Sequence, residues 1–238
     1  MTDYSVKSPS MELMTVSADW IISVTLDDIL RGQAANPAIV RAKKPNLLAV
    51  AERALIEGQK LLHPVTLTQF HAVTEHRHER IGLEGGLRLT GPLVARELAG
   101  AVRLAAVTCT IGGELEKSAA RQFDRDPLFA LALDGLGNAA VEILAQKVCS
   151  QIGETAQRDG LSASTPLSPG SPEWPVEIGQ PQVFALVDIN QAGIRLTSTG
   201  MMIPQKSISF VVGLGNEMAR TDLCSLCSLN ETCRFRHD

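Results

Sequence analysis

Apolar and polar residues follow two different periods along this chain, and each period predicts one kind of element. Alternation predicts strands over residues 19–25, 65–70, 86–90, 193–197 and 206–212, and the apolar run at 102–110 predicts a buried strand. Helical spacing predicts helices over residues 27–31, from 45 to between 58 and 62, and over 92–98, 114–123 and 127–157. Asn46 and Asp126 stand where helix caps are expected, and a proline follows the second of them.

The order of these elements favours one fold class. Strands and helices are mixed irregularly, without the steady strand–helix alternation of a doubly wound parallel sheet. We therefore predict an α+β fold with a mainly antiparallel twisted sheet flanked by helices. Residues 160–182 are rich in Ser, Pro and Gly, which predicts a long loop. We expect residues 1–215 to form the body of the protein and residues 216–238 to form a cysteine-containing C-terminal tail.

Composition and charge argue against several functions. Of the 238 residues, 45% are hydrophobic and 20% are charged, which is enough for a sizeable core. The net charge of −4 and the 4% of aromatic residues argue against a surface that binds nucleic acid or an anionic membrane. The apolar runs at 128–133 and 210–214 are too short to span a bilayer, and the first ten residues lack a signal-peptide pattern. We expect a cytoplasmic protein.

Three of the five cysteines lie close together near the C-terminus. Cys224, Cys227 and Cys233 form a C-x2-C-x5-C pattern, whose thiolates could hold an iron–sulfur cluster or zinc. The fourth ligand could be His237, Cys109, Cys149 or an external molecule. The alternative is a set of exposed thiols on a tail. We favour a metal site, because cysteines clustered at a terminus contribute little to packing.

Two other patterns are weaker indications of a site. The segment GLGNAA, which contains Gly135 and Gly137, matches a dinucleotide fingerprint, but it lacks an acidic residue about twenty positions later. We favour close helix packing there. His76 and His78, with His71 nearby, could bind a metal, but charged neighbours favour a solvated segment.

The loop at residues 166–175 carries four prolines and Gly170. Prolines fix the backbone, and a glycine lets it approach a ligand closely, so the loop suits recognition of a small molecule. The alternative is a stiff cover over the sheet.

Several segments resemble one known family. The run GIRLTSTGMMIPQKSIS at residues 193–209, the turn TIGGELE at 110–116 and the helix at 134–142 are similar, in the same order, to the activation domain of cobalamin-dependent methionine synthase. The resemblance implies a C-shaped α+β domain that binds S-adenosylmethionine. In that family the domain presents the methyl group of this ligand to a corrinoid, and one further electron restores methylcobalamin.

The resemblance also implies binding residues. It places S-adenosylmethionine at Ser168, Gly170 and Ser171, with Asn138 at the position of a family acidic residue and Glu142 one helical turn further on. The chain departs from the family at Pro166, where the family has an arginine, and at Ser171, where it has a tyrosine. No catalytic residue is assigned.

The corrinoid itself is expected on another protein, because no D-x-H-x-x-G segment is present. The implied partners are a corrinoid-binding methyltransferase and an electron donor, for which the cysteine tail could be the entry point. A second possibility is a non-catalytic binding module of the same fold with a structural metal or iron–sulfur tail. Whether the chain is an enzyme stays open at this stage.

Overall fold

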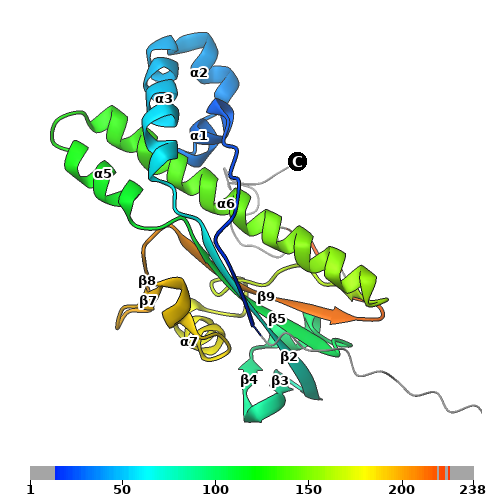
Figure 1. The fold of residues 1–238 in the computed structure, drawn as a ribbon. Helices are drawn as coiled ribbons and strands as arrows, with labels where there is room; N and C mark the ends of the chain where they lie inside the picture. The colour runs from blue at the N-terminus through cyan, green and yellow to red at the C-terminus, as the bar shows by residue number, and fades with distance from the viewer. Residues whose placement is uncertain (1–13, 219, 223–224, 226–238) are drawn as a thin grey trace, which may run out of the picture.

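The computed structural model describes residues 14–218, 220–222 and 225. Its α-helices are α1 (Leu26–Gly32), α2 (Pro37–Lys43), α3 (Pro45–Gly58), α4 (Pro92–Glu97), α5 (Glu114–Gln122), α6 (Pro127–Arg158) and α7 (Val176–Ala185) (Figure 1). Its strands are β1 (Met14–Ser17), β2 (Val65–Arg77), β3 (Arg80–Leu83), β4 (Arg88–Thr90), β5 (Arg103–Thr110), β6 (Ser162–Ala163), β7 (Arg195–Leu196), β8 (Met202–Ile203) and β9 (Ser207–Gly215).

Seven of the strands form one antiparallel sheet in the order β4-β3-β2-β5-β9-β6, with β1 beside the first half of β2. β2 is long enough to pair with β1 along its first half and with β3 along its second half. A register shift between Val73 and Glu75 separates these halves, and such a bulge bends a strand. The predicted α+β fold with a mainly antiparallel sheet is confirmed.

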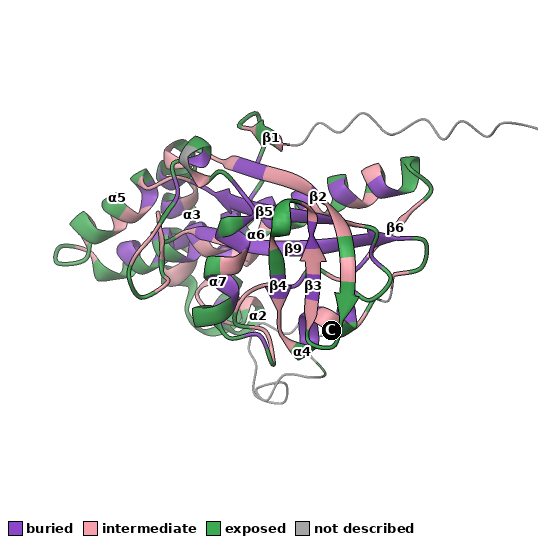
Figure 2. Ribbon diagram, turned by 90° about the horizontal axis from the view of Figure 1, so that it is seen from below, coloured by how far each residue is buried: buried purple, intermediate pink, exposed green. Residues whose placement is uncertain are grey.

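The sheet separates two hydrophobic cores. Alternate side chains of β5 point to opposite faces, so Ala105 and Val107 pack with α6 while Leu104 and Ala106 pack with α4 and α7. Figure 1 shows α6 crossing one face of the sheet, with α1 and α3 above it and α7 on the other side. Figure 2 shows that β5 and β9, the central strands, are buried over most of their length.

α6 begins as the sequence predicts. The Asp126 side chain accepts a hydrogen bond from the backbone N–H of Phe129 at 3.2 Å, and Pro127 occupies the first turn. Among the described residues, α6 alone is long and apolar enough to cross a membrane by length and composition. However, 67% of its most apolar window is buried inside the domain, as in the core helix of a folded protein.

Some predicted elements are wrong. Residues 19–25 form no strand, although Ile22 and Val24 are buried and Ile21 is exposed, as the alternation predicts. The chain leaves the sheet at this point to reach α1, so the segment has no neighbouring strand. Asn46 lies inside α3 and does not cap it, because the helix begins at Pro45. The predicted loop at 160–182 contains β6 and the first part of α7, and α2 and β8 are not predicted at all.

The described residues that follow β9 contact the body. The backbone N–H of Met218 donates to Ser162 Oγ at 2.8 Å, and the hydroxyl of Thr165 donates to the carbonyl of Thr221 at 3.0 Å. The boundary predicted at residue 215 remains a prediction. The three cysteines of the predicted tail lie outside the described residues.

Candidate functional site

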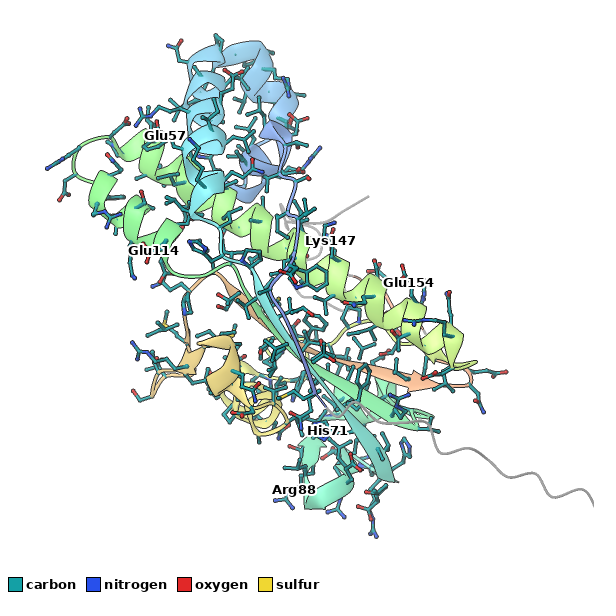
Figure 3. All side chains as sticks on the ribbon, viewed as in Figure 1. Glu57, His71, Arg88, Glu114, Lys147 and Glu154 are labelled. Atoms are coloured by element: carbon teal, nitrogen blue, oxygen red, sulfur yellow. The ribbon has the colours of Figure 1, made fainter. Side chains whose placement is uncertain are left out.

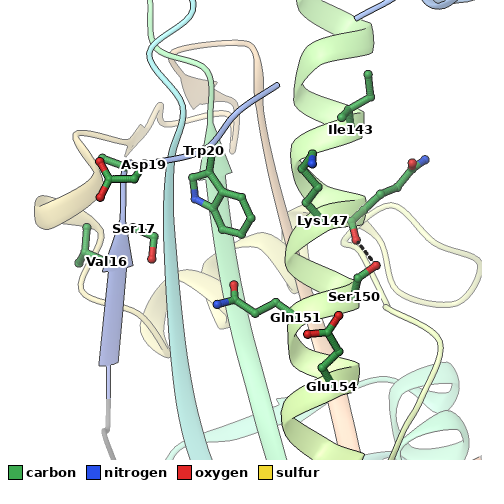
Figure 4. A pocket seen from close by; sticks show the side chains of 11 residues that line it. Val16, Ser17, Asp19, Trp20, Ile143, Lys147, Ser150, Gln151 and Glu154 are labelled. Atoms are coloured by element: carbon green, nitrogen blue, oxygen red, sulfur yellow. Dashed lines mark hydrogen bonds between the residues drawn. The ribbon is translucent and has the colours of Figure 1, made fainter. Parts of the chain in front are cut away.

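A groove of about 850 Å³ lies between α6 and residues 16–20, which comprise the end of β1 and the start of the segment that leads to α1 (Figure 4). From α6 it is lined by Ile143, Gln146, Lys147, Ser150, Gln151 and Glu154. These positions recur three and four residues apart, so they share one face of the helix. The opposite wall ends at Trp20, whose indole lies between residues 16–19 and the helix. The volume is typical of a small-molecule site.

The charged side chains of the groove have no partners within the described part of the chain. Lys147 and Glu154 are exposed on α6, and Asp19 is exposed on the opposite wall. None of them forms an ion pair or a side-chain hydrogen bond with another described residue. Figure 3 shows that Lys147 and Glu154 project from the same helix at some distance from His71 in β2. The groove therefore offers one ammonium and two carboxylates to a ligand.

Trp20 supplies an apolar surface with a fixed orientation. Its Nε1–H donates to Thr66 Oγ1 at 3.0 Å, which holds the indole against the first residues of β2. A planar aromatic ring can stack on such a surface. Sequence reasoning missed this site because its two walls lie more than 120 positions apart. Only the helical spacing of polar residues from 146 to 154 could have indicated a polar face on α6.

Asn138 holds three segments of the fold together. Its amide donates to the carbonyl of Gly32 at 2.9 Å and to Asp134 at 3.3 Å, and its Oδ1 accepts from Lys206 Nζ at 2.7 Å. Lys206 also pairs with Asp134 at 2.6 Å. The side chain of Asn138 therefore joins α6 to α1 and to the turn before β9.

Glu142 lies one turn further along α6, is exposed and forms no ion pair with the described residues. The pKa values of two thiols, those of Cys109 and Cys149, are raised by burial and in smaller part by the negative charge of Glu142. Burial is the main cause, and it raises the pKa of Cys109 to about 12 and that of Cys149 to about 11. Without a metal both thiols are therefore protonated and poor nucleophiles at neutral pH.

The predicted loop with Ser168, Gly170 and Ser171 forms a compact turn. The N–H of Gly170 donates to the carbonyl of Trp174 at 2.8 Å, and the N–H of Ser171 donates to the carbonyl of Ser168 at 3.0 Å. Gly170 has φ +95°, which favours glycine. Trp174 is fully buried beneath the turn. The backbone amides of Gly170 and Ser171 thus bond within the turn itself.

The sheet separates these predicted residues into two groups. Asn138 and Glu142 lie on α6 and therefore above one face. The turn at 168–174 leads into α7, and its Trp174 belongs to the core on the other face. No hydrogen bond among the described residues joins the two groups. Their joint role as a ligand site remains a prediction.

The two weaker patterns have structural explanations. Gly135 and Gly137 lie in the middle of α6, with no strand before them, so the context of a dinucleotide site is missing. His71 and His76 form ring-nitrogen hydrogen bonds with the carbonyls of Leu186 and Ala101, at 2.7 and 3.0 Å. Among the described residues, no group of three His, Cys, Asp or Glu side chains is placed to hold a metal.

These observations define an α+β domain with a long helix over one face of a curled antiparallel sheet and a polar groove beside that helix. No protein-family model and no curated protein matches the chain. In structure it is similar to the MetH reactivation domain, solved as a crystal structure bound to AdoHcy, with a TM-score of 0.64. The likeness covers 88% of this chain and 81% of that chain at 12% identity, so it shows the fold alone.

Proposed function

We propose that this protein is a reactivation-domain-like protein that binds S-adenosylmethionine or S-adenosylhomocysteine and assists methylation of a corrinoid carried by a separate methyltransferase. The observation that supports this function best is the fold, which is shared over 88% of the chain with a domain solved in complex with AdoHcy. The open groove beside α6 supplies a site of suitable size.

The groove residues match the chemistry of this ligand class. S-Adenosylhomocysteine has a flat adenine ring at one end and a zwitterionic amino acid at the other. The indole of Trp20 suits the ring, the ammonium of Lys147 suits the carboxylate, and Asp19 and Glu154 suit the ammonium. Because these three charged groups have no ion-pair partner in the described chain, binding does not require breaking an existing ion pair.

In this proposal the protein binds and orients, while the ligand supplies a methyl group on a sulfonium. Trp20 and Lys147 fix the two ends of the ligand, and the carboxylates favour the cationic sulfonium over the neutral thioether. Positioning is then the main contribution of the chain to a methyl transfer. The corrinoid-binding partner, the electron donor and the iron–sulfur cluster or zinc at Cys224, Cys227 and Cys233 remain parts of the proposal without direct support.

The test is calorimetric titration of S-adenosylhomocysteine and S-adenosylmethionine into the full chain, purified without oxygen. We expect saturable binding that weakens about tenfold or more in Lys147→Met, since a charge-assisted hydrogen bond contributes roughly 1.5–3 kcal/mol. Lys117→Met is the matched control, because Lys117 lies on α5 and pairs with Glu114 at 2.9 Å away from the groove. Equal affinities for both variants would refute the groove as the site.

A second variant tests the loop predicted from the sequence. Gly170→Val places a branched side chain at φ +95°, where its Cβ would lie 3.2 Å from Val176 Cγ2. If Gly170→Val abolishes binding while Lys147→Met leaves it intact, the ligand lies at the loop. If both weaken binding, the ligand reaches both places.

The second candidate function is a non-catalytic binding module of the same fold. The observation that favours it is the turn itself, whose amides at Gly170 and Ser171 already bond within the turn. No heat of binding at millimolar ligand would refute the ligand-binding function and support this second one.

A further inference from the structure

A row of hydroxyl side chains lies on the buried face of the sheet that α7 covers. Thr108 and Thr110 on β5 and Ser207 and Ser209 on β9 are all less than 9% exposed. Further along the same face these strands carry Leu104, Ala106 and Val211, so the polar character is confined to one end of the core. Gln180 on α7, which is 4% exposed, faces this row.

Most of these groups have partners, but two do not. The hydroxyl of Thr110 donates to the carbonyl of Lys206 at 3.3 Å, and that of Ser207 donates to the carbonyl of Pro204 at 2.7 Å. Ser209 donates to Gln180 Oε1 at 3.2 Å. Thr108 Oγ1 and Gln180 Nε2 have no hydrogen-bond partner among the described residues. Rotating the amide of Gln180 would only exchange which of its two polar atoms lacks one.

Ser209 links the two residues that carry the unpartnered atoms. Thr108 and Ser209 are opposite each other in the β5–β9 ladder, so their side chains are neighbours on the same face. Ser209 is bonded to the same amide whose nitrogen lacks a partner. Leaving both groups without hydrogen bonds would cost roughly 1–3 kcal/mol each, and the great majority of buried polar groups avoid this cost.

We propose that Thr108, Ser209 and Gln180 bind one internal water molecule, which joins the inner strands to α7. Water is the ligand that fits, because it can donate to Thr108 or Ser209 and accept from the amide of Gln180. Three polar partners are typical of a conserved internal water. The described residues of this core that surround the three groups include the apolar side chains of Leu104, Ala106 and Val211, which do not favour an ion.

The bound water also stabilises the turn predicted from the sequence. Gly179, which precedes Gln180, packs against that turn so closely that an added Cβ would lie 3.0 Å from Pro169 Cβ and 2.8 Å from the Trp174 ring. Because Gln180 is held by the water, the helix turn that supports residues 168–174 is held as well. This inference does not depend on the proposed function.

The experiment compares thermal unfolding midpoints of the full chain with matched valine variants. Thr108→Val is expected to lower the midpoint by about 2–4 °C, because the water loses a partner while its site persists. Thr110→Val is the control, since its hydroxyl has protein partners and must lower the midpoint whether or not the water exists. An unchanged or raised midpoint in Thr108→Val, with a lowered one in the control, overturns the proposal.

A double variant separates the water from a general loss of packing. If one water joins the two residues, Thr108→Val combined with Gln180→Met should cost no more than Gln180→Met alone, because the second change removes an interaction that is already lost. Full additivity of the two shifts overturns the proposal. A long-lived internal water signal in magnetic relaxation of the wild type, absent from the double variant, is the direct observation expected.

Discussion

The close crossing of α1 and α6 makes Gly135→Ala an informative substitution. An added Cβ at Gly135 would lie 2.7 Å from the carbonyl oxygen of Ile29 and 2.5 Å from Gln33 Cγ. Gln33 can rotate away, but the carbonyl belongs to the backbone of α1, so the helices must separate. From the other side, a Cβ at Gly32 would lie 2.2 Å from the carbonyl oxygen of Gly135.

The expected magnitude is the difference between two opposing effects. Replacing glycine by alanine inside a helix stabilises it by about 1 kcal/mol, whereas overpacking a close contact costs about 1–3 kcal/mol. Because the contact involves backbone and cannot relax easily, the overpacking cost should lie in the upper part of its range, at about 2–3 kcal/mol, which leaves a net loss of about 1–2 kcal/mol. For a chain of this size the unfolding midpoint should fall by about 2–8 °C.

Gly153→Ala is the matched control, because Gly153 lies in the same helix and an added Cβ there meets nothing within 4 Å. That variant should gain about 0.5–1 kcal/mol from helix propensity alone. The assay is thermal and urea unfolding followed by far-ultraviolet circular dichroism. If both variants become more stable by the same amount, the contact between α1 and α6 is not formed as described, and the packing explanation of Gly135 fails.

Three further predictions concern charge and reactivity. Lys206→Met should lower the free energy of unfolding by about 2 kcal/mol, because it removes two charge-assisted hydrogen bonds to α6, as urea unfolding would show. The hydrogen bond from Arg53, followed by that from the Phe129 N–H, holds the pKa of Asp126 below its usual range, so its contribution is present at neutral pH and lost as pH falls through that lowered value. Asp126→Asn should therefore be less stable than the wild type at pH 7, with a difference that shrinks towards pH 3. Finally, Cys109 and Cys149 should be alkylated by iodoacetamide only after unfolding, as peptide mass spectrometry would show, because burial raises the pKa of both thiols.

Much of the fold could be predicted because local chemistry decides it. The cap at Asp126, the proline after it and the apolar spacing that follows fix the start of α6 without any knowledge of tertiary structure. β5 follows from the apolar run at 102–110, while β9 and the first part of β2 follow from the alternation at 206–212 and 65–70. In each case the local preference and the tertiary packing favour the same structure.

At residues 19–25 the local sequence pattern predicts the wrong element. The side chains of this segment alternate between buried and exposed as in a strand, but the hydrogen-bond partners that define a strand come from another segment. Here β1 already occupies the edge of β2 at Ser17, and the chain must cross to α1. Side-chain alternation predicts burial correctly, whereas strand pairing depends on contacts distant in sequence.

The candidate site was harder to predict than the fold. Asp19 and Lys147 are ordinary surface residues in the sequence, and only the fold brings their segments to one groove. The turn at 168–171, where the resemblance places the ligand, has a distinctive composition. Composition shows that a loop is rigid, but it does not show whether its backbone amides are free to bind a ligand.

The two possible ligand positions can be separated by fluorescence, because the chain has two tryptophans and each reports on one of them. Trp20 borders the groove, while Trp174 is fully buried under the turn, and its carbonyl accepts from Gly170. A ligand stacked on Trp20 should quench the emission of the wild type, and this change should vanish in Trp20→Phe, where Trp174 is the remaining emitter. A ligand bound at the turn should instead change the emission of Trp20→Phe as much as that of the wild type. The second result would refute the groove as the site, since an adenine ring on the indole of Trp20 cannot leave its emission unchanged while altering that of a tryptophan buried on the other side of the sheet.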